Sequence, residues 1–320
     1  MDKNAKIYVA GHTGLAGSAL IRKLRALGYN NIVGREQSEL DLTRQEAVES
    51  FFSNEKPAYV ILAAAKVGGI VANNTYPAEF IRDNLAIQTN VIHSAWENNV
   101  ERLIFLGSSC IYPRDCPQPM RESHLLTGPL EPTNEPYAIA KIAGIKMCQS
   151  YNRQYGTRFF AVMPTNLYGP NDNFNLETSH VLPALIRKFH EAKQNNAPAV
   201  TVWGTGTPRR EFLHVDDFAD ACIHIFNLDD DTFDSLIHAY DTPLVNIGCG
   251  RDTTIKSLAE MIREITGFSG DMTFDTARPD GTPQKLLDVS RLDELGWSYS
   301  ISLKEGIRQT YQWCLENSVF

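Results

Sequence analysis

One segment near the N-terminus constrains the fold of this 320-residue chain more than any other. Ile7–Ala10 is a short run rich in β-branched and aromatic residues, which is typical of a buried strand. It is followed at once by Gly11, Gly14 and Gly17, and then by a helix-like run over residues 18–27. Glycines between a strand and a helix allow the backbone to approach a pyrophosphate at the helix N-terminus. The segment predicts a nucleotide-binding unit, although three glycines alone also fit an ordinary turn.

The first 170 residues alternate between expected strands and expected helices. Further strands are predicted over residues 31–34, 59–65, 102–106 and 158–163, with helices between them. One of these helices is expected to begin at a capping box formed by Thr43 and Glu46. Strands that alternate with helices in this way predict a parallel sheet covered on both faces. The fold class is therefore α/β, with a Rossmann-type doubly wound parallel sheet.

The regular alternation ends near residue 170, and a smaller mixed α/β C-terminal substrate domain is expected to follow. Its expected elements are a helix from residue 180, a strand at 200–203, a turn at 204–217 that leads into a helix, an apolar segment at 245–248, and helices over 254–266 and 303–317. We assign residues 1–170, together with roughly 212–242, to the Rossmann domain. Residues 171–211 and 243–320 are assigned to the substrate domain.

Composition argues against several classes of protein. The net charge of −8 argues against an extended nucleic-acid surface. No apolar run approaches the ~20 residues of a membrane span, and the first residues do not form a signal peptide. The six cysteines contain no C-x-x-C pair, so neither a disulfide framework nor a zinc site is indicated. We expect a cytoplasmic protein without a metal, and with neither nucleic acid nor a membrane as its partner.

The end of the expected second strand bears on the cofactor. An acidic residue at this place bonds the ribose 2′-hydroxyl of NAD, whereas an arginine can neutralise the 2′-phosphate of NADP. Arg35 comes first and favours NADP, while Glu36 beside it keeps NAD open. Asp41 and Leu42 are expected to lie near the adenine.

Tyr137 and Lys141 are four residues apart in a stretch of helical composition that follows Pro136. They should therefore share one helix face. A tyrosine pKa near 10 is too high for a ready proton donor, but a nearby ammonium group lowers it. The pair could therefore supply a proton in catalysis. The same spacing more often means a ring at the edge of the core and a solvated lysine.

The expected fourth strand leads directly into Ser108, Ser109 and Cys110. Ligands of open α/β sheets bind beyond the carboxyl ends of the strands. We therefore expect these three residues beside the cofactor. Because free cysteines are commonly buried as small apolar side chains, a filling role remains the alternative for Cys110.

The glycine turn, Ser108 and Tyr137-x-x-x-Lys141 occur in the order found in the extended short-chain dehydrogenases/reductases, and the chain resembles that family. Four longer stretches narrow the resemblance to the GDP-L-fucose synthases, namely residues 64–77, 106–113, 130–144 and 164–170. The similarity extends from Lys6 to about Asn317.

This resemblance implies a bifunctional reaction on GDP-4-keto-6-deoxy-D-mannose. The C4 ketone acidifies the hydrogens at C3 and C5, and the family inverts both carbons with a cysteine and a histidine, which match Cys110 and His180. Free Cys titrates near 8.5 and free His near 6.5, so both can exchange protons near neutrality. Hydride from NADPH then reduces C4 while Tyr137 donates the proton. By the same resemblance, Lys141 bonds the nicotinamide ribose and Ser108 bonds the carbonyl or Tyr137.

The resemblance also implies ligand positions and a homodimer. The matching substrate-binding residues are Lys188, Trp203, Arg210 and Asp280. The matching NADP-binding residues are Gly11, His12, Thr13, Gly14, Leu15, Ala16, Gly17, Arg35, Asp41, Leu42, Leu106, Gly107, Ser108, Ser109, Lys141, Pro164, Thr165, Asn166, Leu167 and His180. The dimer would pair the helices that begin near Ala78 and Tyr137. Several relatives carry arginines where this chain has Thr13 and Gln37, so its preference for NADPH depends largely on Arg35.

Other interpretations stay open at this point. His180 could cap a helix, Trp203 could anchor the second core, and Arg210 could form an exposed pair with the arginine before it. His214 is the competing histidine, although its surroundings in the sequence look structural. The competing functions are a related nucleotide-sugar 4-epimerase or 4,6-dehydratase, and a non-enzymatic NADP-binding sensor. A 4,6-dehydratase would typically have an acidic pair where this chain has Ser109 and Cys110.

Overall fold

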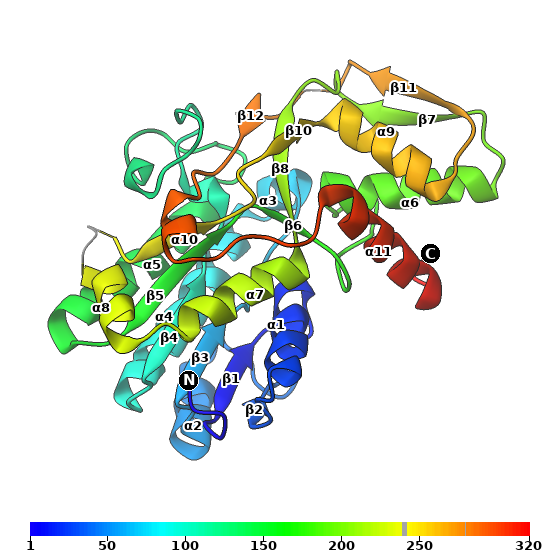
Figure 1. Ribbon diagram of the computed structural model, residues 1–320. Coiled ribbons are helices and arrows are strands. Elements are labelled where there is room, and N and C mark those ends of the chain that lie inside the picture. The colour runs from blue at the N-terminus through cyan, green and yellow to red at the C-terminus, as the bar shows by residue number, and fades with distance from the viewer. Residues whose placement is uncertain (239–241, 279) are drawn as a thin grey trace.

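A six-stranded, fully parallel sheet forms the centre of the larger part of the molecule (Figure 1). The structure is a computed structural model that describes residues 1–238, 242–278 and 280–320. The strand order is β2-β1-β3-β4-β5-β9. The strands are β1 (Ile7–Ala10), β2 (Ile32–Val33), β3 (Tyr59–Leu62), β4 (Arg102–Leu106), β5 (Phe159–Pro164) and β9 (Leu244–Ile247). β1, β3 and β4 are buried along their whole length, as expected for apolar strands covered on both faces.

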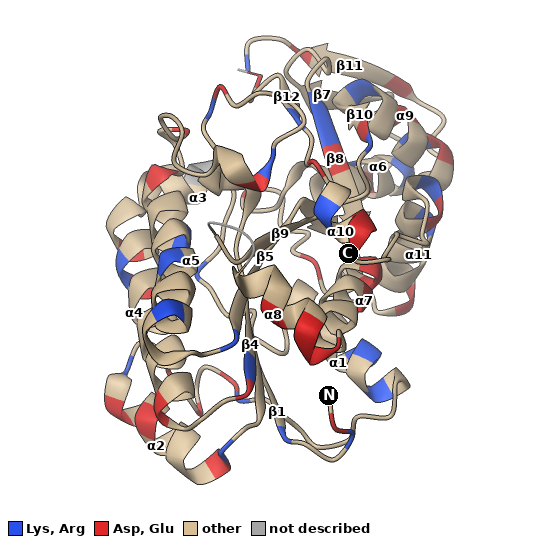
Figure 2. Ribbon diagram, turned by 60° about the vertical axis from the view of Figure 1, so that its left-hand side comes forward, with Lys and Arg blue, Asp and Glu red and all other residues tan. Residues whose placement is uncertain are grey.

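Helices cover both faces of this sheet (Figure 2). One face is covered by α1 (Leu15–Ala26), α7 (Val215–Phe226) and α8 (Asp230–His238), which share one apolar core with the sheet. The other face is covered by α2 (Gln45–Glu55), α4 (Pro77–Glu97) and α5 (Glu135–Tyr155), which build a second core. The predicted fold class, a Rossmann-type doubly wound sheet with a smaller mixed α/β part, is confirmed.

The smaller part lies beyond the carboxyl ends of the strands, at the top of Figure 1. In it, β8 (Arg209–His214) pairs with β6 (Asn166–Tyr168), β10 (Asp252–Thr254) and β12 (Gln284–Lys285), while β7 (Ala199–Trp203) pairs with β11 (Asp271–Asp275). A third apolar core joins α6 (Val181–Gln194), α9 (Ile255–Thr266) and α11 (Leu303–Glu316). The short elements are α3 (Ile70–Thr75), η1 (Ser109–Ile111), η2 (Glu122–His124) and α10 (Ser290–Glu294).

The structure corrects three local expectations. The capping box is absent, because α2 begins after Arg44 without a side-chain cap, and Thr43 Oγ1 donates to Asp41 Oδ1 at 2.7 Å instead. The turn expected over residues 204–217 is confined to its first residues, because strand β8 begins at Arg209 and is followed at once by α7. The third concerns residues 66–77 after β3, whose sequence suggests an apolar loop but which contain the short helix α3.

The domain division stays a prediction, but one strand lies elsewhere than that division implies. β9 was assigned with residues 243–320 to the substrate domain, yet it pairs with β5 in the six-stranded sheet. Residues 239–241, near the expected boundary at 242, lie outside the described part of the chain.

None of the described helices is both long enough and apolar enough to cross a bilayer. No group of three or more His, Cys, Asp or Glu side chains within the described ranges could hold a metal ion.

Candidate active site

The carboxyl end of β4 and the first turns of α5 bring four predicted residues together. β4 runs directly into η1, whose preceding residue Ser108 accepts a hydrogen bond from the Cys110 backbone N–H at 3.5 Å. Tyr137 and Lys141 lie one turn apart on α5, which begins with a proline in its first turn. Ser108 also hydrogen-bonds to the Tyr137 hydroxyl. The predicted grouping of Ser108, Cys110, Tyr137 and Lys141 is therefore present in the structure.

Lys141 is buried and its ammonium is held by the backbone. Its Nζ donates to the Leu106 carbonyl at 2.7 Å and lies 5.8 Å from the centre of the Tyr137 ring. Burial lowers the pKa of Lys141 to about 8, although the neighbouring Cys110 opposes this shift. The lysine is therefore anchored at the end of β4 instead of extending into solvent.

The pKa of Tyr137 moves in the direction opposite to the one expected from its lysine neighbour. Burial raises this pKa strongly, Cys110 raises it further, and only the hydrogen bond from Ser108 lowers it. The reason is that removing the phenol from water disfavours the phenolate, while the Lys141 ammonium is bonded to Leu106. Tyr137 thus holds its proton firmly in this state of the protein.

Cys110 is a buried thiol whose pKa is raised by burial. Three neighbours oppose this shift, namely the Ser108 hydroxyl and the cationic groups of Lys285 and Lys141. An apolar filling residue would not need two ammonium groups within electrostatic reach. The surroundings therefore favour the proton-transfer role over the filling role.

His180 occupies the position before α6, as the sequence predicted, but it does not cap the helix with its side chain. Protein atoms around the ring lower its pKa by excluding water, and the positive charge of Lys285 lowers it further. The residue still keeps an exposed surface. The imidazole is therefore biased towards its neutral form, which can accept a proton.

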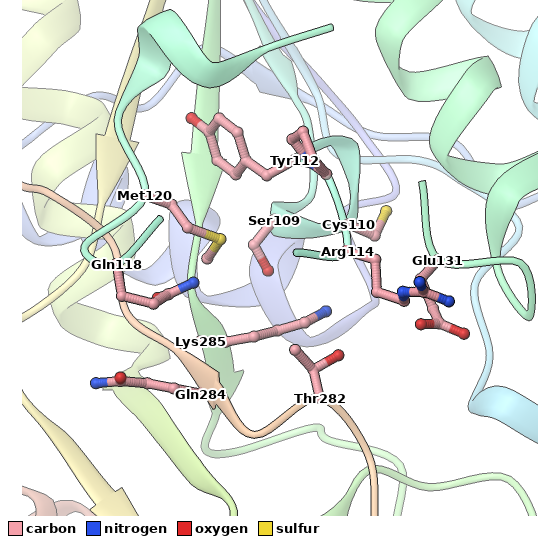
Figure 3. A pocket seen from close by; sticks show the side chains of 11 residues that line it. Ser109, Cys110, Tyr112, Arg114, Gln118, Met120, Glu131, Thr282, Gln284 and Lys285 are labelled. Atoms are coloured by element: carbon pink, nitrogen blue, oxygen red, sulfur yellow. The ribbon is translucent and has the colours of Figure 1, made fainter. Parts of the chain in front are cut away.

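Lys285 is a site residue that the sequence reasoning missed. It lies on the two-residue strand β12 and lines a cavity with Ser109 and Cys110 (Figure 3). No motif marks it, and a two-residue strand has no periodicity to read. The charge on Lys285 affects both Cys110 and His180, so it joins residues from η1 and α6 into one electrostatic site.

The glycine turn has the geometry of a pyrophosphate cradle. Gly11 has a φ of +79°, and an added Cβ there would lie 2.8 Å from the Ala64 backbone nitrogen. A Cβ on Gly17 would lie 2.0 Å from the Gly11 carbonyl oxygen. Gly14 precedes α1 and has no side chain over the first turn. This close backbone packing at a helix N-terminus fits a dinucleotide.

The residues expected to bind the adenosine part of the cofactor are arranged differently from what the sequence predicted. The Arg35 guanidinium, which we expected to bind a 2′-phosphate, pairs with Glu55 at 2.7 Å. The His12 imidazole lies close against Gly34 and is 3.9 Å from the Glu36 carboxylate. Arg35 must therefore exchange its carboxylate partner, or share it, to bind a phosphate.

The remaining predicted cofactor positions lie in the turn before α1 and its first residues, at the ends of β4 and β5, or in the segment between β2 and α2. Thr165 Oγ1 and Asn166 Nδ2 both donate to the Glu211 backbone carbonyl, at 3.2 and 2.7 Å. Gly107 packs so closely on Met163 that a Cβ would lie 2.4 Å from the methionine methyl group. The other positions are Thr13, Leu15, Ala16, Asp41, Leu42, Leu106, Ser109, Pro164 and Leu167, and their contact with a cofactor stays a prediction.

The predicted substrate residues gather in the smaller part of the molecule. The Lys188 ammonium lies 4.7 Å from the centre of the Trp203 ring, and the Arg278 guanidinium lies 4.8 Å from it. Trp203 is 54% exposed, so the predicted core-anchor alternative is wrong for this residue. Arg278 was not identified from the sequence, although arginine beside an exposed tryptophan is a common binding pattern.

Arg210 and Asp280 lie close together on β8 and the loop before β12. Burial lowers the pKa of Arg210, and the Asp280 carboxylate opposes that shift. Asp280 accepts hydrogen bonds from the Thr205 N–H at 2.9 Å and from its hydroxyl at 2.7 Å. The competing residue His214 is instead buried in the core, where its ring accepts from the Asp216 N–H.

Comparison with known proteins gives the family. The family model described as the NAD dependent epimerase/dehydratase family matches residues 7–235. GDP-L-fucose synthase 1 of Arabidopsis thaliana is 62% identical over 316 residues, which are 99% of this chain and 95% of that protein. GDP-L-fucose synthase of Escherichia coli (strain K12) is 56% identical over 317 residues, 98% of this chain and 97% of that protein. The chain belongs to the GDP-L-fucose synthase family.

A solved structure from Campylobacter jejuni agrees with this assignment to the GDP-L-fucose synthase family. The GDP-mannoheptose C4 reductase MlghC, with NADP bound, has a TM-score of 0.90 and 44% identity. The match covers 98% of this chain and 99% of that chain. NADP is accordingly the cofactor of this protein. That its pyrophosphate lies in the glycine turn stays a prediction.

Proposed function

We propose that the protein converts GDP-4-keto-6-deoxy-D-mannose to GDP-L-fucose with NADPH. It first inverts C3 and C5 and then reduces the C4 ketone. The observation that carries the proposal is the joining of two proton-transfer groups, Cys110 and His180, to the reduction pair Tyr137 and Lys141 through shared electrostatic contacts. A plain dehydrogenase would need only the second pair.

Epimerisation uses Cys110 and His180 as its two acid/base groups. The C4 ketone withdraws electrons from C3 and C5, so a base can remove a proton from either carbon and leave an enolate. A proton delivered to the opposite face inverts the carbon. The resting thiol can donate a proton and the resting imidazole can accept one, because burial raises the pKa of Cys110 and lowers that of His180.

Reduction uses Ser108, Tyr137 and Lys141. NADPH supplies the hydride for C4 when it is bound. Ser108 hydrogen-bonds to Tyr137 and orients its hydroxyl. Tyr137 delivers its proton to the C4 oxygen as charge develops there. Lys141, fixed to the Leu106 carbonyl, holds a positive charge that stabilises the resulting phenolate.

Charged and aromatic groups in the smaller part bind the nucleotide. Lys188 and Arg210 are cations suited to the diphosphate, and the planar arginine can bond two phosphate oxygens. Trp203 offers an exposed ring for the guanine or the sugar. Asp280 serves as an acceptor for ligand hydroxyls or amines.

The test is turnover with the purified protein. GDP-4-keto-6-deoxy-D-mannose and NADPH should give GDP-L-fucose, identified by NMR, with one NADPH consumed per sugar. Relatives include a GDP-mannoheptose C4 reductase, so the product must be examined at C3 and C5. A reduced sugar with both centres unchanged would overturn the epimerase part, and no turnover with folded protein would overturn the whole proposal.

The same proposal includes a cytoplasmic homodimer. A catalytic thiol such as Cys110 needs a reducing compartment to stay free. The helices α4 and α5 pack against each other, and Ile139 and Tyr155 on α5 are exposed. The Tyr155 ring stacks on Trp96 of α4, with the ring centres 4.2 Å apart. Light scattering should give the mass of two chains, and Ile139→Glu should shift it towards one.

A further inference from the structure

Lys285 places a positive charge beside Cys110. Figure 3 shows its side chain passing below Ser109 and Cys110, with the nitrogen turned towards the side where Cys110 and Glu131 lie. The three residues line one cavity with Lys285.

The backbone around Lys285 is held from two sides. β12 pairs in parallel with β8, so that Lys285 lies opposite Arg210. The next two backbone N–H groups are both bonded to side chains, Leu286 to Gln118 Oε1 at 2.8 Å and Leu287 to Glu211 Oε2 at 2.9 Å. The backbone position of the lysine is therefore set by the fold.

Glu211 connects this strand to a second turn. It is fully buried, and its other carboxylate oxygen accepts from the N–H groups of Cys249 and Gly250 at 2.6 and 2.7 Å. A buried carboxylate that bonds three separate backbone groups is costly to remove. Glu211 thus fixes the place of β12 relative to β9 and β8.

We propose that Lys285 is a positioning residue for epimerisation, whose ammonium stabilises the thiolate of Cys110 during proton transfer at C3 and C5. The inference rests on the proposed function of Cys110. When Cys110 protonates the enolate, its S–H bond breaks and a C–H bond forms. The enolate electron pair makes the new C–H bond, and the S–H electron pair stays on sulfur as the thiolate. Lys285 keeps its own proton throughout.

The charges around the thiol support this role. Lys285 and Lys141 both face Cys110, together with the Ser108 hydroxyl. Cys110, Arg210 and Glu131 face Lys285. Burial raises the pKa of Cys110 and lowers that of Lys285, and the attraction between the two groups opposes both shifts. Without Lys285, Lys141 would remain as the cationic group, among the described residues, that opposes the effect of burial on the thiol.

Lys285 also acts on the second proton-transfer group. Its charge lowers the pKa of His180, in addition to the effect of the surrounding protein. One cation therefore favours the thiolate on Cys110 and the neutral imidazole on His180. The thiolate is the form that Cys110 takes after it has donated its proton, and the neutral imidazole is the form of His180 that can accept one.

The direct test is the titration of Cys110 in the enzyme alone. The ultraviolet absorbance of thiolate is followed against pH in the parent, Lys285→Met and Lys285→Arg, and the curve of the same protein carrying Cys110→Ala is subtracted each time. We expect Lys285→Met to raise the Cys110 midpoint by about one pH unit, a roughly tenfold loss of thiolate at a given pH. Lys285→Arg should keep the Cys110 midpoint close to that of the parent.

Two further variants separate this role from a structural one. Lys256→Met removes an exposed lysine and should leave the midpoint unchanged. Glu131→Gln removes an anion that faces Lys285, and should lower the midpoint. If Lys285→Met does not fold, the shift of the Cys110 midpoint in Glu131→Gln alone decides whether the proposal stands. Equal midpoints in the parent and the folded variants would overturn the proposal.

Substrate exchange gives a second readout. Lys285→Met should slow solvent deuterium uptake at C3 and C5 by about tenfold near neutrality and move its optimum to higher pH. A parent protein that titrates as expected but makes no GDP-L-fucose would overturn the proposed function and leave the titration result standing. Normal turnover of the parent with no titration shift in Lys285→Met would overturn the role of Lys285 and leave the proposed function standing.

Discussion

The reduction half of the site and the epimerisation half are built in different ways. Ser108, Tyr137 and Lys141 come from the end of one strand and the first turns of one helix. Ser108 hydrogen-bonds to the Tyr137 hydroxyl, and Lys141 donates to the Leu106 carbonyl at the end of that strand. Cys110 and His180 come from η1 and α6 and are linked through the charge of Lys285 on β12. Direct bonds fix geometry, whereas a shared charge adjusts proton affinity. The two halves should therefore fail in different ways when they are altered.

Tyr137→Phe should have the largest effect, and only on the reduction half. Removing the hydroxyl removes the proton donor, and such groups contribute about 10²–10⁴-fold to rate. NADPH oxidation, followed by its absorbance, should fall by that factor while NADPH binding is retained. Retention of more than a tenth of the parent rate would mean that another group protonates the C4 oxygen.

The pH dependence of exchange should identify the epimerisation half. The pKa of His180 is lowered in the folded protein, so the imidazole stays neutral to below its ordinary value near 6.5. Deuterium uptake that needs the neutral ring should fall about tenfold per pH unit only below that lowered value. NMR titration of the His180 ring, assigned with His180→Gln, measures it directly, and a value above 6.5 would contradict the structure.

The lowered pKa of His180 also makes the free energy of unfolding depend on pH. Between pH 6.5 and the lowered pKa of His180, the unfolded chain binds a proton at this histidine but the folded chain does not. The free energy of unfolding therefore falls as the pH falls through this range. His180→Gln should remove that part of the pH dependence. Chemical denaturation at several pH values would check it.

Trp203→Ala should have an intermediate effect that is common to both halves. The exposed ring, flanked by Lys188 and Arg278, is expected to bind the nucleotide far from the reacting carbons. Ring contacts of this kind contribute about 0.5–1.5 kcal/mol. The KM for the sugar nucleotide should rise up to about tenfold, equally for exchange and reduction, with kcat little changed.

Glu55→Gln should have the smallest effect. Glu55 pairs with Arg35 at 2.7 Å and also with Lys6 at 3.0 Å. Neutralising it frees Arg35 for the 2′-phosphate, so NADPH should bind a few-fold more tightly while NADH does not, since exposed ion pairs are worth about 1 kcal/mol or less. Fluorescence titration with both nucleotides checks this, with Glu49→Gln on the same helix as the matched control.

The reduction half could be predicted from the sequence because its signals are local. The spacing of Tyr137 and Lys141 and the glycine turn each reveal a geometry within one or two elements. The sign of the Tyr137 pKa shift could not be predicted, because it depends on burial by distant segments. The capping box at Thr43 failed for a similar reason, since Asp41 competes for the hydroxyl.

The epimerisation half could be predicted only through family resemblance. Nothing near Cys110 or His180 in the sequence marks them as partners, because about 70 residues separate them and only the fold brings them together. Lys285 could not be found at all, since β12 exists only through its pairing with β8. The glycines and arginines of residues 204–217 suggested a turn, but pairing of β8 with three other strands makes residues 209–214 of that segment sheet.

The ratio of exchange to reduction in two variants tests the central claim most directly. Deuterium uptake at C3 and C5 and NADPH oxidation are measured in the same samples of Cys110→Ser and Tyr137→Phe. The account predicts that Cys110→Ser loses uptake far more than Tyr137→Phe does, and that Tyr137→Phe keeps uptake while losing reduction. Equal losses of uptake in the two variants would contradict the division of labour between the two halves of the site.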